Sequence, residues 1–145
     1  MVQVRRTMVV RKPVDVVANY LKDFARTEEW DPGTVSCIRL GEGPIRVGTR
    51  WHNVSRFRGR ETELTYELTR LEPEHLVFVG RNRTATSTDD LTLVSAPNGT
   101  VITYQATIVF NGLAKLADPF LKREFERLGD AVVDAMTAKV NAITV

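Results

Sequence analysis

The sequence has one cysteine and only two histidines among its 145 residues. Cys37 has no partner for an internal disulfide, which suits a reducing cytoplasm, and we expect it to be a small buried hydrophobe. His52 and His75 lie far apart and have no Cys, His or carboxylate at ligand spacing, so we expect no metal site. Residues 41–44 lack the lysine and helix of a phosphate loop, and we expect no cofactor.

Neither a strong net charge nor a long apolar run occurs in the sequence. Twenty basic and 18 acidic residues give a net charge of +2, which provides no electrostatic footprint for nucleic acid. No apolar stretch approaches the roughly 20 residues that span a bilayer, so we expect no stable membrane insertion. Residues 1–12 include arginines but no signal-peptide core, which also favours the cytoplasm.

The chain instead shows the pattern of one small α+β domain over residues 1–145. β-branched residues predict a first strand at 2–10, which Lys12-Pro13 ends because proline cannot donate to the hydrogen-bond ladder. Apolar residues at helical spacing then predict a short helix over 14–21. Asp23 can cap a second short helical piece.

The remainder of the chain divides into strands and one helix. We expect strands at residues 34–40, 49–57, 61–71, 76–82, 86–95 and 100–110. Apolar and polar residues alternate over 61–71, which is the pattern of a sheet with one dry and one wet face. An apolar stripe over 112–145 predicts a long C-terminal helix that Pro119 kinks or divides.

The last two strands form a hairpin whose register can be tested by the facing of its side chains. A two-residue Asn98-Gly99 loop pairs Leu93 with Tyr104 and keeps the apolar sets of both strands on one side. It also places Asp89 opposite Ile108, on the dry side. The interpretation we favour is a β-bulge that exposes Asp89, because a second aspartate follows it directly.

Several local motifs accompany this order of elements. They are Lys12-Pro13-Val14-Asp15-Val16-Val17, Asp23-Phe24, Glu29-Trp30-Asp31-Pro32-Gly33, Arg46-Val47-Gly48-Thr49, Asn98-Gly99-Thr100-Val101-Ile102-Thr103-Tyr104 and Pro119-Phe120-Leu121. In their order and spacing, over essentially the whole chain, they resemble the polyketide cyclase/dehydrase branch of the START-like (SRPBCC) superfamily. The resemblance implies the helix-grip fold, a curved antiparallel sheet of about seven strands around a long C-terminal helix, with two short helices after the first strand. It also implies an internal pocket, but no universal catalytic motif.

We expect the pocket between the dry face of the sheet and the C-terminal helix. The candidate ligand-binding residues are Trp51, Asn53, Tyr66, Phe78, Asp89 and Tyr104 on strands, and Phe120, Phe125, Leu128, Val132 and Met136 on the helix. Buried tyrosine hydroxyls need partners, and they either orient a polar group of a ligand or bond one another and water in a filled core. We place a gate at residues 112–118, beside Pro119.

Three functions are open on this sequence. The first is binding of a hydrophobic small molecule such as a lipid, a quinone or a polyketide-like aromatic. The second is a cofactor-independent polyketide cyclase or dehydratase, in which Asp89 beside tyrosine hydroxyls acts as general acid or base. The third is a protein-interaction module with a filled core. A homodimer is compatible with each of them.

Overall fold

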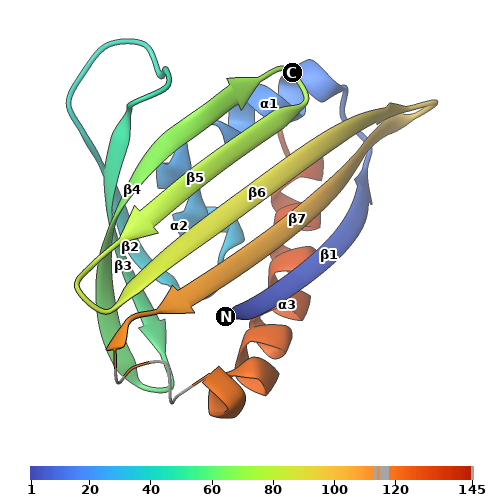
Figure 1. Cartoon of the computed structure of the whole chain (residues 1–145). Coiled ribbons are helices and arrows are strands. Elements are labelled where there is room, and N and C mark those ends of the chain that lie inside the picture. Colours follow the sequence, from blue (N-terminus) through green and yellow to red (C-terminus); the bar gives the residue numbers. More distant parts are fainter. Residues whose placement is uncertain (113, 115–117, 145) are drawn as a thin grey trace.

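A computed structural model describes residues 1–112, 114 and 118–144 of the chain, with the backbone alone at residues 118–120 (Figure 1). Its elements are β1 (Val2–Val10), α1 (Val14–Leu21), η1 (Phe24–Arg26), α2 (Thr27–Trp30), β2 (Thr34–Leu40), β3 (Arg50–Phe57), β4 (Arg60–Glu72), β5 (His75–Arg81), β6 (Ala85–Ala96), β7 (Gly99–Phe110) and α3 (Asp118–Asn141). Each strand begins and ends within about one residue of its predicted bounds, because the turn residues mark them clearly. Asp23 caps η1 by accepting a hydrogen bond from the Ala25 amide at 3.0 Å, as expected.

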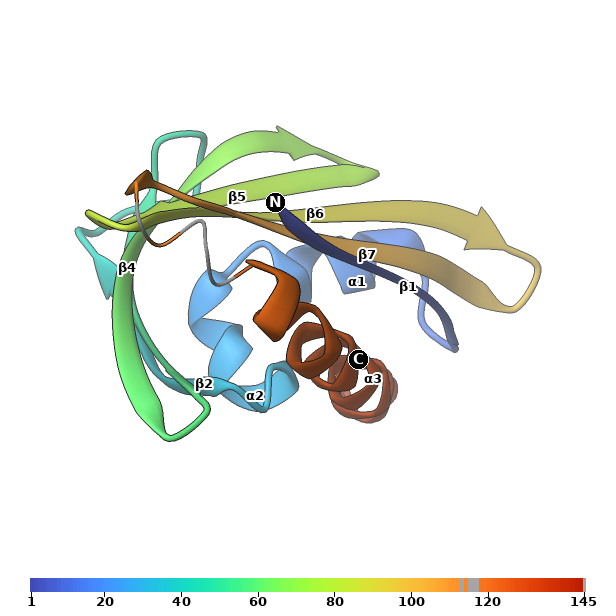
Figure 2. The same ribbon diagram turned by 60° about the horizontal axis from the view of Figure 1, so that its bottom comes forward.

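The strands form one antiparallel sheet in the order β1-β7-β6-β5-β4-β3-β2. Register shifts interrupt the ladder between Leu68 and Arg70 and between Thr34 and Ser36, and such bulges increase the local bend of a sheet. Figure 2 shows the sheet curling over α1, α2 and α3, which all lie under its concave face. The predicted helix-grip fold is therefore confirmed.

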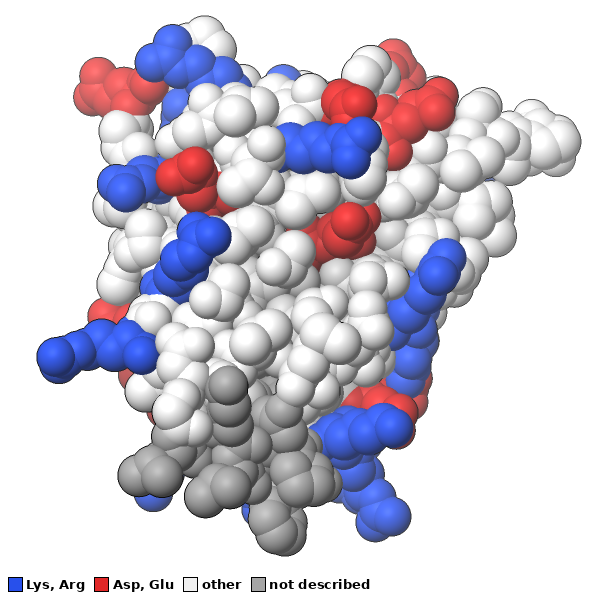
Figure 3. All heavy atoms as spheres, viewed as in Figure 1, with Lys and Arg blue, Asp and Glu red and all other residues white. Residues whose placement is uncertain are grey.

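The outer face of the sheet carries exposed apolar side chains such as Val9, Val94 and Val109 together with charged ones that form ion pairs between strands. Arg56 binds Glu61 at 2.8 Å, and His52 binds Glu63 at 2.8 Å. In Figure 3 the basic and acidic side chains of this face are interspersed among uncharged ones. Exposed pairs of this kind add little stability, but they fix which face of each strand meets water.

An aromatic cluster fills one part of the concave face. Phe24 packs against Tyr66 at 4.4 Å and against Phe78 at 4.5 Å between ring centroids, and Trp51 lies 5.7 Å from Phe78. Trp30 is fully buried beside them. The short helices after β1 therefore supply the large side chains that close this part of the core.

The β6–β7 hairpin differs from the predicted register by two residues. Its loop is Pro97-Asn98, and Gly99 already pairs with Ala96, so that Asp89 faces Ala106. Gly99 lies in the ladder because it approaches β1: a Cβ on it would lie 1.9 Å from the Val10 carbonyl oxygen.

A shift of two residues leaves every side chain on its predicted face. Asp89 therefore points inward, only 5% exposed, and no register shift interrupts β6 beside it. The favoured interpretation, a bulge that exposes Asp89, is wrong. The reason is that the space beneath Asp89 is hollow, as the site below shows, so burial does not force its carboxyl against apolar atoms.

The C-terminal helix is shorter than the predicted 112–145. It begins at Asp118, so Pro119 lies in its first turn, where proline costs no hydrogen bond, and the expected kink within the helix does not occur. The alternative, a separate first segment that Pro119 ends, falls largely on residues 113 and 115–117, outside the described residues. It ends at Asn141, whose side chain accepts the Arg11 amide at 2.7 Å. Gly129 allows close approach to β1, since a Cβ on it would lie 2.7 Å from Val4.

We expect Gly99→Ala to destabilise the fold, because the new methyl group would collide with the Val10 carbonyl. Overpacking of this kind costs about 1–3 kcal/mol. Chemical denaturation measures the loss, with Asn98→Ala in the adjoining exposed loop as the control. Equal stabilities of the two variants would contradict the close approach of β7 to β1.

Candidate functional site

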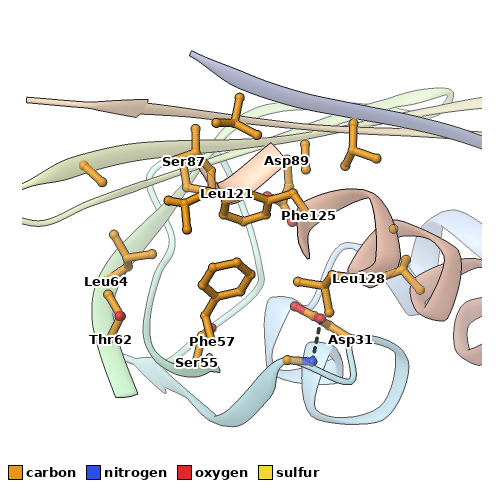
Figure 4. Close-up of a pocket in the computed structure, with 18 of the residues that line it drawn as sticks. Asp31, Ser55, Phe57, Thr62, Leu64, Ser87, Asp89, Leu121, Phe125 and Leu128 are labelled. Carbon is orange, nitrogen blue, oxygen red and sulfur yellow. Dashed lines mark hydrogen bonds between the residues drawn. The ribbon is translucent and has the colours of Figure 1, made fainter. Parts of the chain in front are cut away.

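A cavity of about 200 Å³ lies between the concave face of the sheet and α3 (Figure 4). Strands β1, β3, β4, β6 and β7 contribute to its walls, together with α3 and the turn at residues 31–33. Its apolar lining includes Val2, Val4, Phe57, Leu64, Ile108, Phe110, Leu121, Phe125, Leu128 and Val132. Empty space of this size in a close-packed interior marks a binding-site candidate.

Small side chains on the sheet account for the cavity. Ala85 and Ser87 on β6 and Ala106 on β7 face inward at the hollow part, whereas Leu93 and Ile102 face inward farther along the same two strands. Side chains alternate along each strand, so all five residues share one face of the sheet. The change from large to small side chains along that face leaves the space that the helices do not fill.

The polar wall of the cavity contains two hydrogen bonds that tyrosine hydroxyls donate. Tyr66 donates its phenolic hydrogen to Ser87 Oγ at 3.1 Å, and Tyr104 donates to Asp89 Oδ2 at 3.4 Å. Tyr66 lies across the neighbouring strand because Gly80 has no Cβ, which would otherwise come within 2.7 Å of the ring. The two tyrosines therefore bond other side chains and not each other.

A second carboxyl reaches the cavity from below the sheet. Asp31 accepts a hydrogen bond from the Gly33 amide through Oδ1 and one from the Thr34 hydroxyl through Oδ2, each at 3.0 Å (Figure 4). These bonds hold the turn after α2 and fix the Asp31 carboxyl in the cavity wall. Asp31 and Asp89 thus face the same space from opposite layers of the fold.

Burial makes both carboxyl groups weak acids. The pKa of Asp89 is raised to about 8: removal from water contributes most, the charge of Asp31 adds to the shift, and the Tyr104 hydrogen bond opposes it. Burial also raises the pKa of Asp31, against the two hydrogen bonds that lower it. Asp89 is therefore mostly protonated at neutral pH, and it can act as a hydrogen-bond donor.

Two stacked rings border the cavity beside α3. Phe57 at the end of β3 and Phe125 on α3 stack with their centroids 4.7 Å apart and their planes 13° from parallel. Both are half-buried and line the cavity, so separating them would widen its access to solvent. The predicted gate at 112–118 falls largely on residues 113 and 115–117, outside the described residues.

The structure divides the predicted site residues into two groups. Tyr66, Asp89, Tyr104, Phe125, Leu128 and Val132 line the cavity. Trp51, Asn53, Phe78 and Met136 are buried away from it, and the Phe120 side chain lies outside the description. The second group shares the inward facing of the first but lies along the part that the aromatic cluster fills.

Asp31, Ser87 and Ala106 are lining residues that the sequence analysis missed. Asp31 begins the turn signal Asp31-Pro32-Gly33, and its bonds to Gly33 and Thr34 explain it fully without any role in a cavity. The inward-facing small residues of β6 and β7 were the available signal, because a dry sheet face with Ala and Ser in place of large side chains leaves volume unfilled.

Neither histidine belongs to a metal centre in the described part of the chain, where no cluster of three or more potential ligands occurs. His75 is half-buried and binds Asp90 at 2.9 Å. Cys37 is buried and free, as predicted. No helix among the described residues has the length and apolarity needed to cross a bilayer.

Comparison with known proteins identifies the family. The family described as polyketide cyclase / dehydrase and lipid transport matches residues 1–141, so the chain belongs to it. This confirms the resemblance drawn from the motifs. No curated protein matches the chain in sequence.

Solved structures share the fold at low sequence identity. TTHA0849 from Thermus thermophilus has a TM-score of 0.81 at 14% identity, covering 99% of both chains. A START superfamily protein from Mycobacterium smegmatis has a TM-score of 0.79 at 13% identity, covering 98% of this chain and 99% of the other. The Zhui aromatase/cyclase from Streptomyces has a TM-score of 0.77 at 16% identity, covering 95% of this chain and 92% of the other. The chain therefore has the START-like fold.

We expect Asp89→Asn to gain stability over the wild type as pH rises. Because the folded-state pKa of Asp89 is raised from 3.8 to about 8, the unfolded chain loses its proton first, and wild-type stability falls between those values. Asparagine keeps an acceptor for Tyr104 without this cost, so the difference should grow to at most about 5 kcal/mol near pH 8.

Urea denaturation at a series of pH values measures this difference, with Asp134→Asn on the exposed side of α3 as the control. A constant difference between Asp89→Asn and wild type over the whole range would show that Asp89 is solvated.

Proposed function

We propose that the protein binds a hydrophobic small molecule, such as a lipid, a quinone or a polyketide-like aromatic, in the cavity between the sheet and α3. The observation that carries this proposal is the cavity of about 200 Å³, with mostly apolar walls and a few convergent polar groups. Membership of a polyketide cyclase / dehydrase and lipid transport family supports it. The single free Cys37 fits a reducing compartment such as the cytoplasm.

The size of the cavity favours compact ligands. An apolar cavity of about 150 Å³ is large enough to bind benzene in another protein. The space here therefore accepts a compact ring system without rearrangement, while a longer molecule requires the Phe57–Phe125 stack to open. A filled-core interaction module is disfavoured, because the core is hollow beside these rings.

Acid–base catalysis is the second candidate, and the placement of the acids favours it. Asp89 holds a proton at neutral pH beside Tyr104, and Asp31 faces the same cavity. In a dehydration, protonated Asp89 would donate its proton to a leaving hydroxyl group, and Asp31, when it is in its carboxylate form, would remove a proton from the neighbouring carbon, which releases water and leaves a double bond. Two acids whose environments differ suit such a division of roles.

We expect Ala106→Leu to weaken binding of any cavity ligand by at least about tenfold, because the larger side chain fills the space. Native mass spectrometry of the purified protein identifies copurifying molecules, and fluorescence titration with lipids, quinones and aromatic polyketides measures affinity. Ala138→Leu, on the exposed side of α3, is the matched control. Binding of no compound by the wild type, or equal binding by both variants, would refute the cavity as the site.

Catalysis is tested separately with Asp89→Asn. In the catalytic hypothesis this variant loses dehydration or cyclisation of a bound polyketide-like compound by about a hundredfold or more and still binds it, because only the proton donor is removed. Product analysis by mass spectrometry measures turnover. Unchanged turnover would leave the protein a binder without this chemistry.

A further inference from the structure

The cavity contains two acids without a basic partner in the described part of the chain. Arg56 contributes to the lining, but it lies on the outward-facing side of β3, where its guanidinium binds Glu61 at 2.8 Å and is 61% exposed. Arg6 on the inner side of β1 is held at 2.8 Å by Asp130 of α3. Neither cation therefore neutralises Asp31 or Asp89.

When it is ionised, Asp89 also has an acceptor atom available to a ligand. Its Oδ2 accepts from Tyr104, whereas no described residue donates to Oδ1. The residue is only 5% exposed, but protein atoms do not enclose Oδ1 completely. Because Asp89 lines the cavity, this oxygen opens on the cavity. A buried carboxyl oxygen left open in this way is costly unless a ligand supplies a donor.

Other titratable groups around Asp89 do not supply that donor. Tyr66 on β4 gives its hydrogen to Ser87, Tyr104 on β7 already binds Asp89, and Asp31 adds negative charge. Burial raises the pKa of both tyrosines well above the usual value, so both remain neutral. Among the described residues, the local electrostatic field at Asp89 is therefore set by acids.

We infer that Asp31 and Asp89 form the subsite for the protonated amine of an apolar, ring-containing amine ligand, and that the same acids exclude carboxylates. This inference rests on the proposed binding function and names the ligand class. An ammonium group has several donors for the oxygens of two carboxyls and neutralises charge that the fold leaves unpaired. The rings of Phe57, Phe125 and Tyr66 offer an apolar lining and faces that attract cations.

Three probes with one naphthalene body test the inference: naphthylmethylamine, naphthylmethanol and naphthoic acid. Near pH 9, where Asp89 is ionised and the amine keeps most of its charge, we expect the amine to bind at least about tenfold more tightly than the alcohol. Near pH 6 Asp89 regains its proton, and the preference should shrink. The acid should bind more weakly than the alcohol at both values.

Isosteric variants assign the preference to the two acids. Asp89→Asn and Asp31→Asn should each bring the ratio of amine affinity to alcohol affinity down to about one. The affinity of each variant for the alcohol is measured beside it, so that a general change in the cavity is separated from loss of the preference for the amine. Asp90→Asn makes the same change on the outer side of β6 and should retain the preference.

The outcomes separate the two proposals. Equal binding of amine and alcohol near pH 9, or a preference that survives in both cavity variants, would overturn the amine subsite and leave the binding function standing. Tighter binding of the alcohol near pH 6 and near pH 9 would assign the subsite to a neutral hydroxyl or carbonyl ligand instead. Failure of all three probes would count against the cavity as a binding site for compact apolar molecules and would refute the inference with it.

Discussion

Side-chain volume along the concave face of the sheet decides where this protein is solid and where it is hollow. The rings of Phe24, Trp51 and Phe78 interlock over one part of that face. Beyond these rings the strands carry the small side chains of Ser87 and Ala106. The side chains of α3 do not fill the volume that these small residues leave, and the cavity remains. The rigid cluster therefore anchors the helices, and the neighbouring volume stays free for a ligand without loss of the core.

The hollow sets the chemistry of the carboxyl groups in its wall. In a filled core, Asp89 would need a buried cation or would destabilise the fold. In the cavity Asp89 keeps one oxygen available, and its pKa is raised to about 8. Asp31 reaches the same space while its bonds to Gly33 and Thr34 hold the turn. The shape of the site and the acidity of its carboxyl groups both follow from the unfilled volume under the sheet, so the cavity selects ligand size and ligand charge together.

Local sequence patterns predicted the elements well, and contacts between distant residues limited the rest. Strand bounds followed from alternation and turn residues, and the fold followed from the family resemblance that the order of the elements and the local motifs carry. The predicted hairpin register was wrong because Asn98-Gly99 is a strong turn signal. In the structure Gly99 lies in the strand instead, where the absence of a side chain allows close approach to Val10 of β1. Asp89 was a candidate site residue on the dry side of the sheet, but its exposure by a bulge was favoured, because the cost of an inward acid depends on the space around it, which no single strand reveals. Asp31 was missed because its role in the turn explained it completely.

The account is tested most directly by the carboxyl-carbon NMR titration of Asp89 in the ligand-free protein. A desolvated acid that faces a cavity without a cation should titrate at about 8, and its resonance should shift when a naphthalene probe binds. Titration near the ordinary value of about 4, with no response to any probe, would show that Asp89 is solvated and that the wall described here does not exist.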